Sequence, residues 1–133
     1  MATELLQVLY AVLIALGYLL VYAVRANMEI GPEYTAGPRD APPLRPISAL
    51  CGRLQRAYAN HVETLPWFAT AMIVAHLAAR ADPWVVGAGW VYLAARVVYL
   101  PAYATGVAFV RSIVWAIATS AILFIILRVL LWQ

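Results

Sequence analysis

An uncharged apolar run near the start of the chain restricts the possible folds more than any other feature of this sequence. Residues 5–24 read LLQVLYAVLIALGYLLVYAV and contain no Asp, Glu, Lys or Arg. About 20 apolar residues are what a helix needs to cross the hydrocarbon core of a bilayer. The run does not resemble a cleaved signal peptide, because Glu4 stands where a basic segment belongs and the apolar stretch is too long. The sequence therefore predicts a membrane-spanning helix here.

The composition extends this expectation to the whole chain, which is predicted to be one domain over residues 1–133. Hydrophobic residues make up 65% of the sequence and charged residues only 11%, whereas soluble domains carry about a quarter charged residues. Every basic residue is an arginine, and the arginines are spread among apolar segments, so the net charge of +3 provides no basic face for nucleic acid. The single cysteine, Cys51, excludes an intrachain disulfide. No His, Cys, Asp and Glu set has zinc spacing, so no metal site is predicted.

Four apolar segments follow one another, which predicts an all-α integral membrane protein with a bundle of four transmembrane helices. The spans are expected at residues 5–24, 53–79, 84–104 and 112–127 with the tail that follows. Residues 25–52, rich in proline, glycine and charge, are expected to be a long loop, and Asp82 is expected to start the third span. Six arginines flank the first and third connections and two flank the opposite ends. This bias favours a cytoplasmic position for those two connections, with both termini on the other side.

Polar residues on the second and third spans predict one shared site. At about 100° per residue, four polar residues of the second span lie within about 80° of one another: Arg53, Arg56, Asn60 and Glu63. Four residues of the third span lie within about 60°: Tyr92, Arg96, Tyr99 and Tyr103. Arg111, at the head of the fourth span, is expected nearby. One carboxylate cannot neutralise four arginines, so the site is expected to keep a positive surplus and to bind an anion.

Each of these residues also has a structural interpretation. Arg53 and Arg56 can extend to lipid head groups, and the tyrosines can belong to the aromatic belt at the membrane interface. His61 and His76 are expected to be core or interface residues rather than metal ligands. Arg96 and Glu63 fit a structural interpretation least, because an ionisable group within a span is costly and is by default a functional candidate.

Three segments resemble the MAPEG family, the membrane-associated proteins in eicosanoid and glutathione metabolism. RAYANHVETLPWF at 56–68 is similar to the Arg-Ala-x-x-Asn-x-x-Glu stretch that opens the second helix in that family, with Pro and Phe following. RVVYLPAY at 96–103 resembles the family's Arg-x-x-Tyr-x-x-x-Tyr, and RS at 111–112 resembles the arginine that heads its fourth helix. Tyr58 departs from the pattern, since many family enzymes have histidine or glutamine there. The resemblance implies a homotrimer that binds glutathione between subunits near the cytoplasmic face.

The same resemblance, to a microsomal glutathione transferase-like member, implies a detoxification enzyme that conjugates or reduces hydrophobic electrophiles. Seven residues are implied to bind glutathione, the cosubstrate: Arg53, Arg56, Asn60, Glu63, Arg96, Tyr99 and Tyr103. Arginine forks suit the two carboxylates of glutathione, and Glu63 suits its ammonium group. Arg111 is implied to be catalytic, because a guanidinium beside the thiol favours the nucleophilic thiolate.

Two other functions stay open from the sequence. The first is a relative that binds a lipid or a thiol without catalysis. The second is a small exporter, which would normally need an acidic residue within a span for coupling. Glu4 lies at the very end of the first span and Glu63 lies amid arginines, so the sequence favours a thiol site over an exporter.

Overall fold

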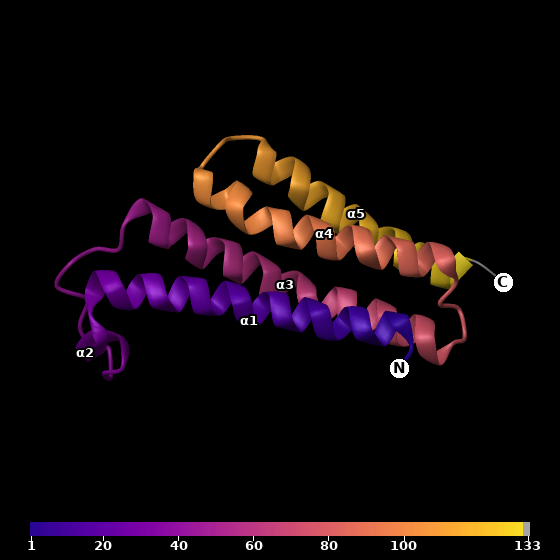
Figure 1. Ribbon diagram of the computed structural model, residues 1–133, viewed down its shortest axis with the longest axis horizontal. Coiled ribbons are helices and arrows are strands. Elements are labelled where there is room, and N and C mark those ends of the chain that lie inside the picture. The colour runs from indigo at the N-terminus through magenta and orange to yellow at the C-terminus, as the bar shows by residue number, and fades with distance from the viewer. Residues whose placement is uncertain (132–133) are drawn as a thin grey trace.

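Four long helices and one short helix make up the protein. The computed structural model describes residues 1–131, which form α1 (Thr3–Ile30), α2 (Pro32–Thr35), α3 (Ala49–Leu77), α4 (Pro83–Thr105) and α5 (Val110–Leu131). The long helices lie side by side as two antiparallel hairpins, α1 with α3 and α4 with α5 (Figure 1). The prediction of an all-helical protein is confirmed for the part of the chain that the structure describes.

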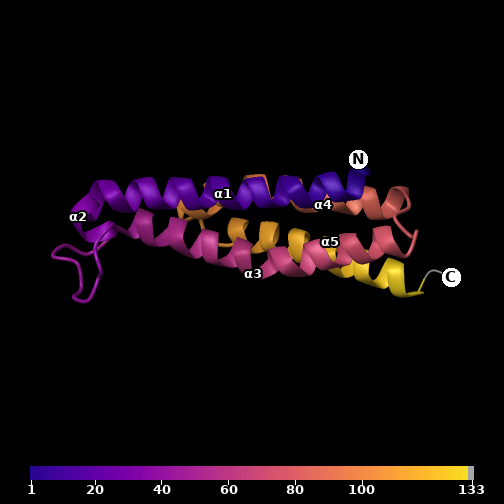
Figure 2. The ribbon, with the colours of Figure 1, turned by 90° about the horizontal axis from the view of Figure 1, so that it is seen from below.

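The two ends of the bundle differ. Both termini and the α3–α4 turn lie at one end, which we call the terminal end, and the first loop and the α4–α5 link lie at the other, which we call the loop end (Figures 1 and 2). The α4–α5 hairpin stops short of the α1–α3 hairpin at the loop end (Figure 1). The first and third connections therefore share one end, as the predicted topology requires.

Three of the four predicted spans coincide with helices that could cross a membrane by length and composition. Three helices, α1, α4 and α5, are long and apolar enough to cross a membrane. Helix α3 has 29 residues and is not among the three, and polar residues such as Asn60, His61 and Glu63 interrupt its apolar sequence.

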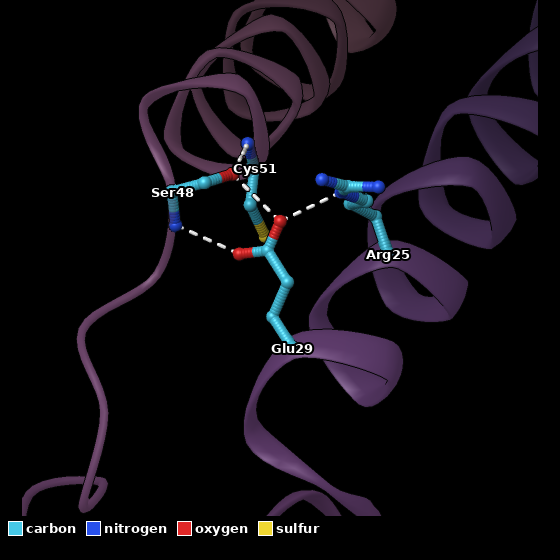
Figure 3. A network of polar contacts seen from close by, with 4 residues as sticks. All are labelled: Arg25, Glu29, Ser48 and Cys51. Atoms are coloured by element: carbon cyan, nitrogen blue, oxygen red, sulfur yellow. Dashed lines mark hydrogen bonds and ion pairs between the residues drawn. The ribbon is translucent and has the colours of Figure 1, made fainter.

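The first loop is shorter than the predicted 25–52, because a polar network joins the end of α1 to the start of α3 (Figure 3). The Glu29 carboxylate accepts hydrogen bonds from Arg25 Nε at 2.6 Å, Ser48 N at 2.7 Å and Ser48 Oγ at 2.6 Å. Ser48 is also the N-cap of α3, since its Oγ accepts a hydrogen bond from Cys51 N at 3.1 Å. Cys51 is buried beside this cap. The network fixes where α3 begins and so the register of its polar stripe.

Asp82 caps α4, as the sequence predicts. Its Oδ1 accepts hydrogen bonds from Trp84 N at 3.0 Å and Val85 N at 2.9 Å. Its Oδ2 accepts two more from Arg128 of α5, at 2.8 and 2.6 Å. The hydrogen bond from Val85 is the largest cause that lowers the pKa of Asp82, and the Arg128 guanidinium lowers it further. The carboxylate therefore links the start of α4 to the last turn of α5.

The core contains aromatic side chains and close helix contacts. The rings of Phe68 and Tyr92 stack with centroids 4.0 Å apart, which joins α3 to α4. Gln7 of α1 donates its amide to Val86 O at 2.9 Å and lies against Gly89 of α4. A Cβ at Gly89 would lie 2.4 Å from Gln7 Oε1, so a larger residue there would have to displace the Gln7 amide that joins α1 to α4.

The two histidines join α1 to α3. His61 is fully buried, with Nε2 3.0 Å from Ala11 O, and His76 Nδ1 lies 2.8 Å from Glu4 Oε1 at the terminal end. Both contacts are between helices, which agrees with the structural interpretation of these residues.

Candidate functional site

The polar stripes of α3 and α4 face each other. Arg96 Nη1 donates to Asn60 Oδ1 at 2.9 Å, and Arg96 Nη2 donates to Thr64 Oγ1 at 2.7 Å. Asn60 and Thr64 are four residues apart, so both side chains lie on the side of α3 that meets α4. Two of the N–H groups of Arg96 are therefore used within the protein, whereas its Nε is buried without a partner among the described residues.

Arg96 is fully buried among aromatic rings. Its side chain has no exposed surface, and its guanidinium carbon lies 5.3 Å from the ring centroids of both Tyr92 and Tyr99. Such contacts stabilise a cation that has been removed from water. Tyr18 of α1 adds a hydrogen bond to the backbone, from its OH to Arg96 O at 2.5 Å. Arg96 thus holds α3 and α4 together, and it reaches no surface in this structure.

Tyr103 is the point where α3, α4 and α5 meet. Its phenol oxygen accepts hydrogen bonds from Arg56 Nε at 3.2 Å and from Arg111 Nη1 at 3.0 Å. The guanidinium carbons of Arg56 and Arg111 lie 5.9 and 5.0 Å from the Tyr103 ring centroid. Tyr99 packs edge-on against the same ring, with centroids 5.6 Å apart. Two cations from different helices therefore converge on one phenol, and both retain exposed surface.

Arg53 contacts the backbone rather than this phenol. Its Nη1 donates to Ala104 O at 3.1 Å, in the last turn of α4. The side chain is half-buried at the loop end, where the α4–α5 link begins.

Glu63 lies at the exposed edge of the α3 stripe. Within residues 1–131 it has no hydrogen bond or ion pair from its carboxylate, and the Trp67 side chain one turn further along is 53% exposed. Glu63 is not the partner of Arg96, which bonds Asn60 and Thr64 instead. The structure therefore leaves this carboxylate available to a ligand or to another chain.

The site keeps a positive surplus. We define the arginine cluster by the four arginines near the loop end: Arg53, Arg56, Arg96 and Arg111. In the described part of the chain, none of the four forms an ion pair with a carboxylate. Their hydrogen bonds go to neutral oxygens of tyrosine, asparagine, threonine and the backbone. A site of this kind attracts anions and favours the ionised form of an acidic group placed in it.

Two residues of the site were not predicted. Thr64 accepts from Arg96, and its four-residue spacing from Asn60 was a signal that could have identified it. Tyr18, which bonds Arg96 O, lies in an apolar run whose sequence gives no indication of this contact. Among the described residues, no group of three His, Cys, Asp or Glu side chains is placed to hold a metal ion.

Comparison with known proteins identifies the family. The model of the MAPEG family matches residues 5–131, nearly the whole chain. A search of curated proteins gives no match. The match extends over all four long helices, and three of these are apolar enough to cross a bilayer. The chain is therefore an integral membrane protein that belongs to the MAPEG family.

Proposed function

We propose that this protein is a glutathione-dependent membrane enzyme that conjugates or reduces hydrophobic electrophiles. The observation that carries the proposal is the convergence of Arg56 and Arg111 on the phenol of Tyr103, in a cluster without a paired carboxylate. Membership of the MAPEG family supports a function of this general class. A cationic site that opens near the membrane surface suits a charged thiol cosubstrate, and the surrounding bilayer concentrates apolar electrophiles.

The groups in and around the cluster match the chemistry of glutathione. The tripeptide carries two carboxylates, one ammonium group and one thiol. The Arg56 guanidinium suits a carboxylate, which it can bind through two parallel hydrogen bonds. Glu63, unpaired in the described chain, suits the ammonium group. Asn60, Tyr99 and Tyr103 offer polar groups to the peptide units, and the buried Arg96 holds Asn60 in position.

Arg111 is the proposed catalytic residue. A guanidinium beside the thiol of glutathione favours the thiolate, which is the nucleophilic form. The thiolate then attacks an electrophilic carbon, a carbon–sulfur bond forms, and the leaving group departs with the electron pair of its bond. With a lipid hydroperoxide, two molecules of the thiol would reduce the peroxide to the alcohol and water and form the disulfide.

The proposed assembly is a trimer in which α3 also crosses the membrane. The charged first half of α3 is then covered by a neighbouring subunit and by the cosubstrate rather than by lipid. Loops one and three face the cytoplasm in this arrangement, because arginines are concentrated at the loop end.

The test measures binding and thiolate formation separately in detergent. Arg111→Leu should lower the conjugation rate with a reactive aryl halide at least about 100-fold, as expected when a donor to developing charge is lost. It should also abolish the ultraviolet absorbance of the bound thiolate while glutathione binding changes less than about threefold. Lysine at this position should restore part of the rate, since it keeps the charge but not the fixed fork. Glu63→Gln should weaken binding instead.

Arg45→Leu is the matched control, because it removes one positive charge from the exposed first loop without touching the cluster. Equal loss of rate in Arg45→Leu and Arg111→Leu would contradict the catalytic role. A parent protein that binds glutathione but forms no thiolate and converts neither an aryl halide nor a lipid hydroperoxide would be a binding relative rather than an enzyme.

A further inference from the structure

We propose that Arg53 is a positioning residue: it clamps the end of α4 and the turn at Gly106, and so sets the place of Arg111. The proposal rests on the catalytic role of Arg111 proposed above. In this role Arg53 fixes the position of another site residue, whereas the sequence predicts that Arg53 binds the ligand itself.

The first observation is the hydrogen bond from Arg53 to the C-terminus of α4. The last four carbonyls of a helix have no partner within the helix, and Ala104 O is one of these in α4. Arg53 Nη1 donates to it at 3.1 Å. The C-terminus of a helix also carries a partial negative charge, which a guanidinium complements. Arg53, from the start of α3, thus acts as the side-chain cap of α4.

The second observation is the contact between Arg53 and Gly106. Gly106 ends α4 in the left-handed conformation, with φ 71° and ψ 13°. A Cβ at this position would lie 2.5 Å from Arg53 Cζ and 2.6 Å from Arg53 Nη1. The guanidinium therefore lies directly against the glycine, where any side chain would displace it. Both the conformation and the close contact favour glycine here.

The third observation is the short link that follows. Only residues 106–109 separate α4 from α5, and Phe109 closes the link with a φ of 69°. Left-handed backbone at both ends leaves the link little freedom, so a shift at Gly106 is transmitted to the first turn of α5. Arg111 lies in that turn and reaches back to Tyr103 OH, which lies three residues before Gly106. The fixed turn at residues 106–109 therefore holds Arg111 within hydrogen-bond distance of Tyr103 OH.

The experiment removes the contact between Arg53 and the end of α4 in two ways, by changing Arg53 and by changing Gly106. Arg53→Met removes the guanidinium and keeps much of the apolar length of the side chain. Gly106→Asn leaves Arg53 in the sequence but puts a Cβ where its guanidinium lies, and asparagine tolerates the left-handed conformation better than most residues. Because the displaced group is the end of a flexible side chain, we expect the variant to fold. Arg45→Met is the control for loss of one charge at the same end.

Two measurements test the positioning role of Arg53 separately from the proposed function of the site. Hydrogen exchange in detergent, without ligand, should show faster exchange of the amides of residues 105–112 in both variants and not in Arg45→Met. With glutathione, the pH midpoint of thiolate formation should rise by about one unit, a tenfold loss of thiolate stabilisation, while the dissociation constant changes less than about threefold. The double variant should resemble Arg53→Met alone, because both changes remove the same contact.

The opposite results would overturn the proposal. If Arg53 binds the ligand directly, Arg53→Met should weaken glutathione binding at least about tenfold, Gly106→Asn should not, and the exchange of residues 105–112 should equal that of the parent. If the parent forms no thiolate at all, the proposed catalytic role of Arg111 fails. The exchange of residues 105–112 then decides the clamp by itself, since that measurement needs no glutathione.

Discussion

A guanidinium buried between membrane helices, as in Arg96, has to find its hydrogen-bond partners within the protein. Arg96 finds two, Asn60 and Thr64, and lies between the rings of Tyr92 and Tyr99. Arg96→Lys keeps the charge but loses the planar fork and the stacking, which lysine does not reproduce. We expect a loss of about 2 kcal/mol in the free energy of unfolding. Thermal unfolding in detergent measures it.

Arg45→Lys is the control for this prediction, because Arg45 is exposed on the first loop and its replacement should change stability by less than about 0.5 kcal/mol. An Arg96→Lys variant as stable as the parent, but with weakened glutathione binding, would return Arg96 to the ligand-binding role that the sequence predicts.

At the scale of elements, Asp82 connects the start of α4 to the last turn of α5. Its pKa is lowered in the folded protein, so the carboxylate stabilises the fold at a pH above its unfolded pKa, which is about 3.9. This contribution is lost as the pH falls through the lower folded value. At pH 7 we therefore expect Asp82→Asn to melt below the parent, and Asp82→Ala to melt lower still because it also loses the cap, at a cost of about 1 kcal/mol.

Melting curves of the three proteins at neutral and acidic pH test this. Asparagine keeps an oxygen that can cap Trp84 and Val85 but has no charge for Arg128. The parent and Asp82→Asn should therefore converge in acid. A difference between them that is the same at both pH values would show that the charge of Asp82 does not contribute.

At the scale of the whole molecule, a single chain leaves charges on surfaces that a bilayer would cover. Glu63 and Arg56 are both exposed on α3, and a charged side chain facing lipid at the centre of a membrane costs about 2.5–3.5 kcal/mol by insertion scales. We therefore expect copies of the chain to associate, as the trimer that the family resemblance implies, and glutathione to stabilise the assembly by binding between them. Native mass spectrometry from mild detergents should detect trimers, with a larger fraction when glutathione is present. Monomers alone in every mild detergent would contradict the prediction.

The sequence by itself was enough for the class of fold and for the prediction that polar residues of the second and third long helices lie together. Apolar runs of about 20 residues have few alternatives to membrane helices, and α1, α4 and α5 are long and apolar enough to cross a membrane in the structure. Helical spacing also indicated which side chains share a face, because the period of a helix is fixed. The cap at Asp82 followed from the same local rules.

The partners of each arginine were decided only by the tertiary structure. Spacing places Arg53, Arg56 and Arg96 on polar faces, but whether a long side chain reaches a ligand, a phenol or a helix end depends on where the neighbouring helix lies. That position comes from contacts between residues far apart in the sequence, such as Gln7 against Gly89 and Arg53 against Gly106. The same holds in part for the start of α3, where the local cap at Ser48 is held by the hydrogen bonds that Ser48 donates to Glu29 of α1. Local periodicity determines a face of a helix, whereas packing between helices determines what that face meets.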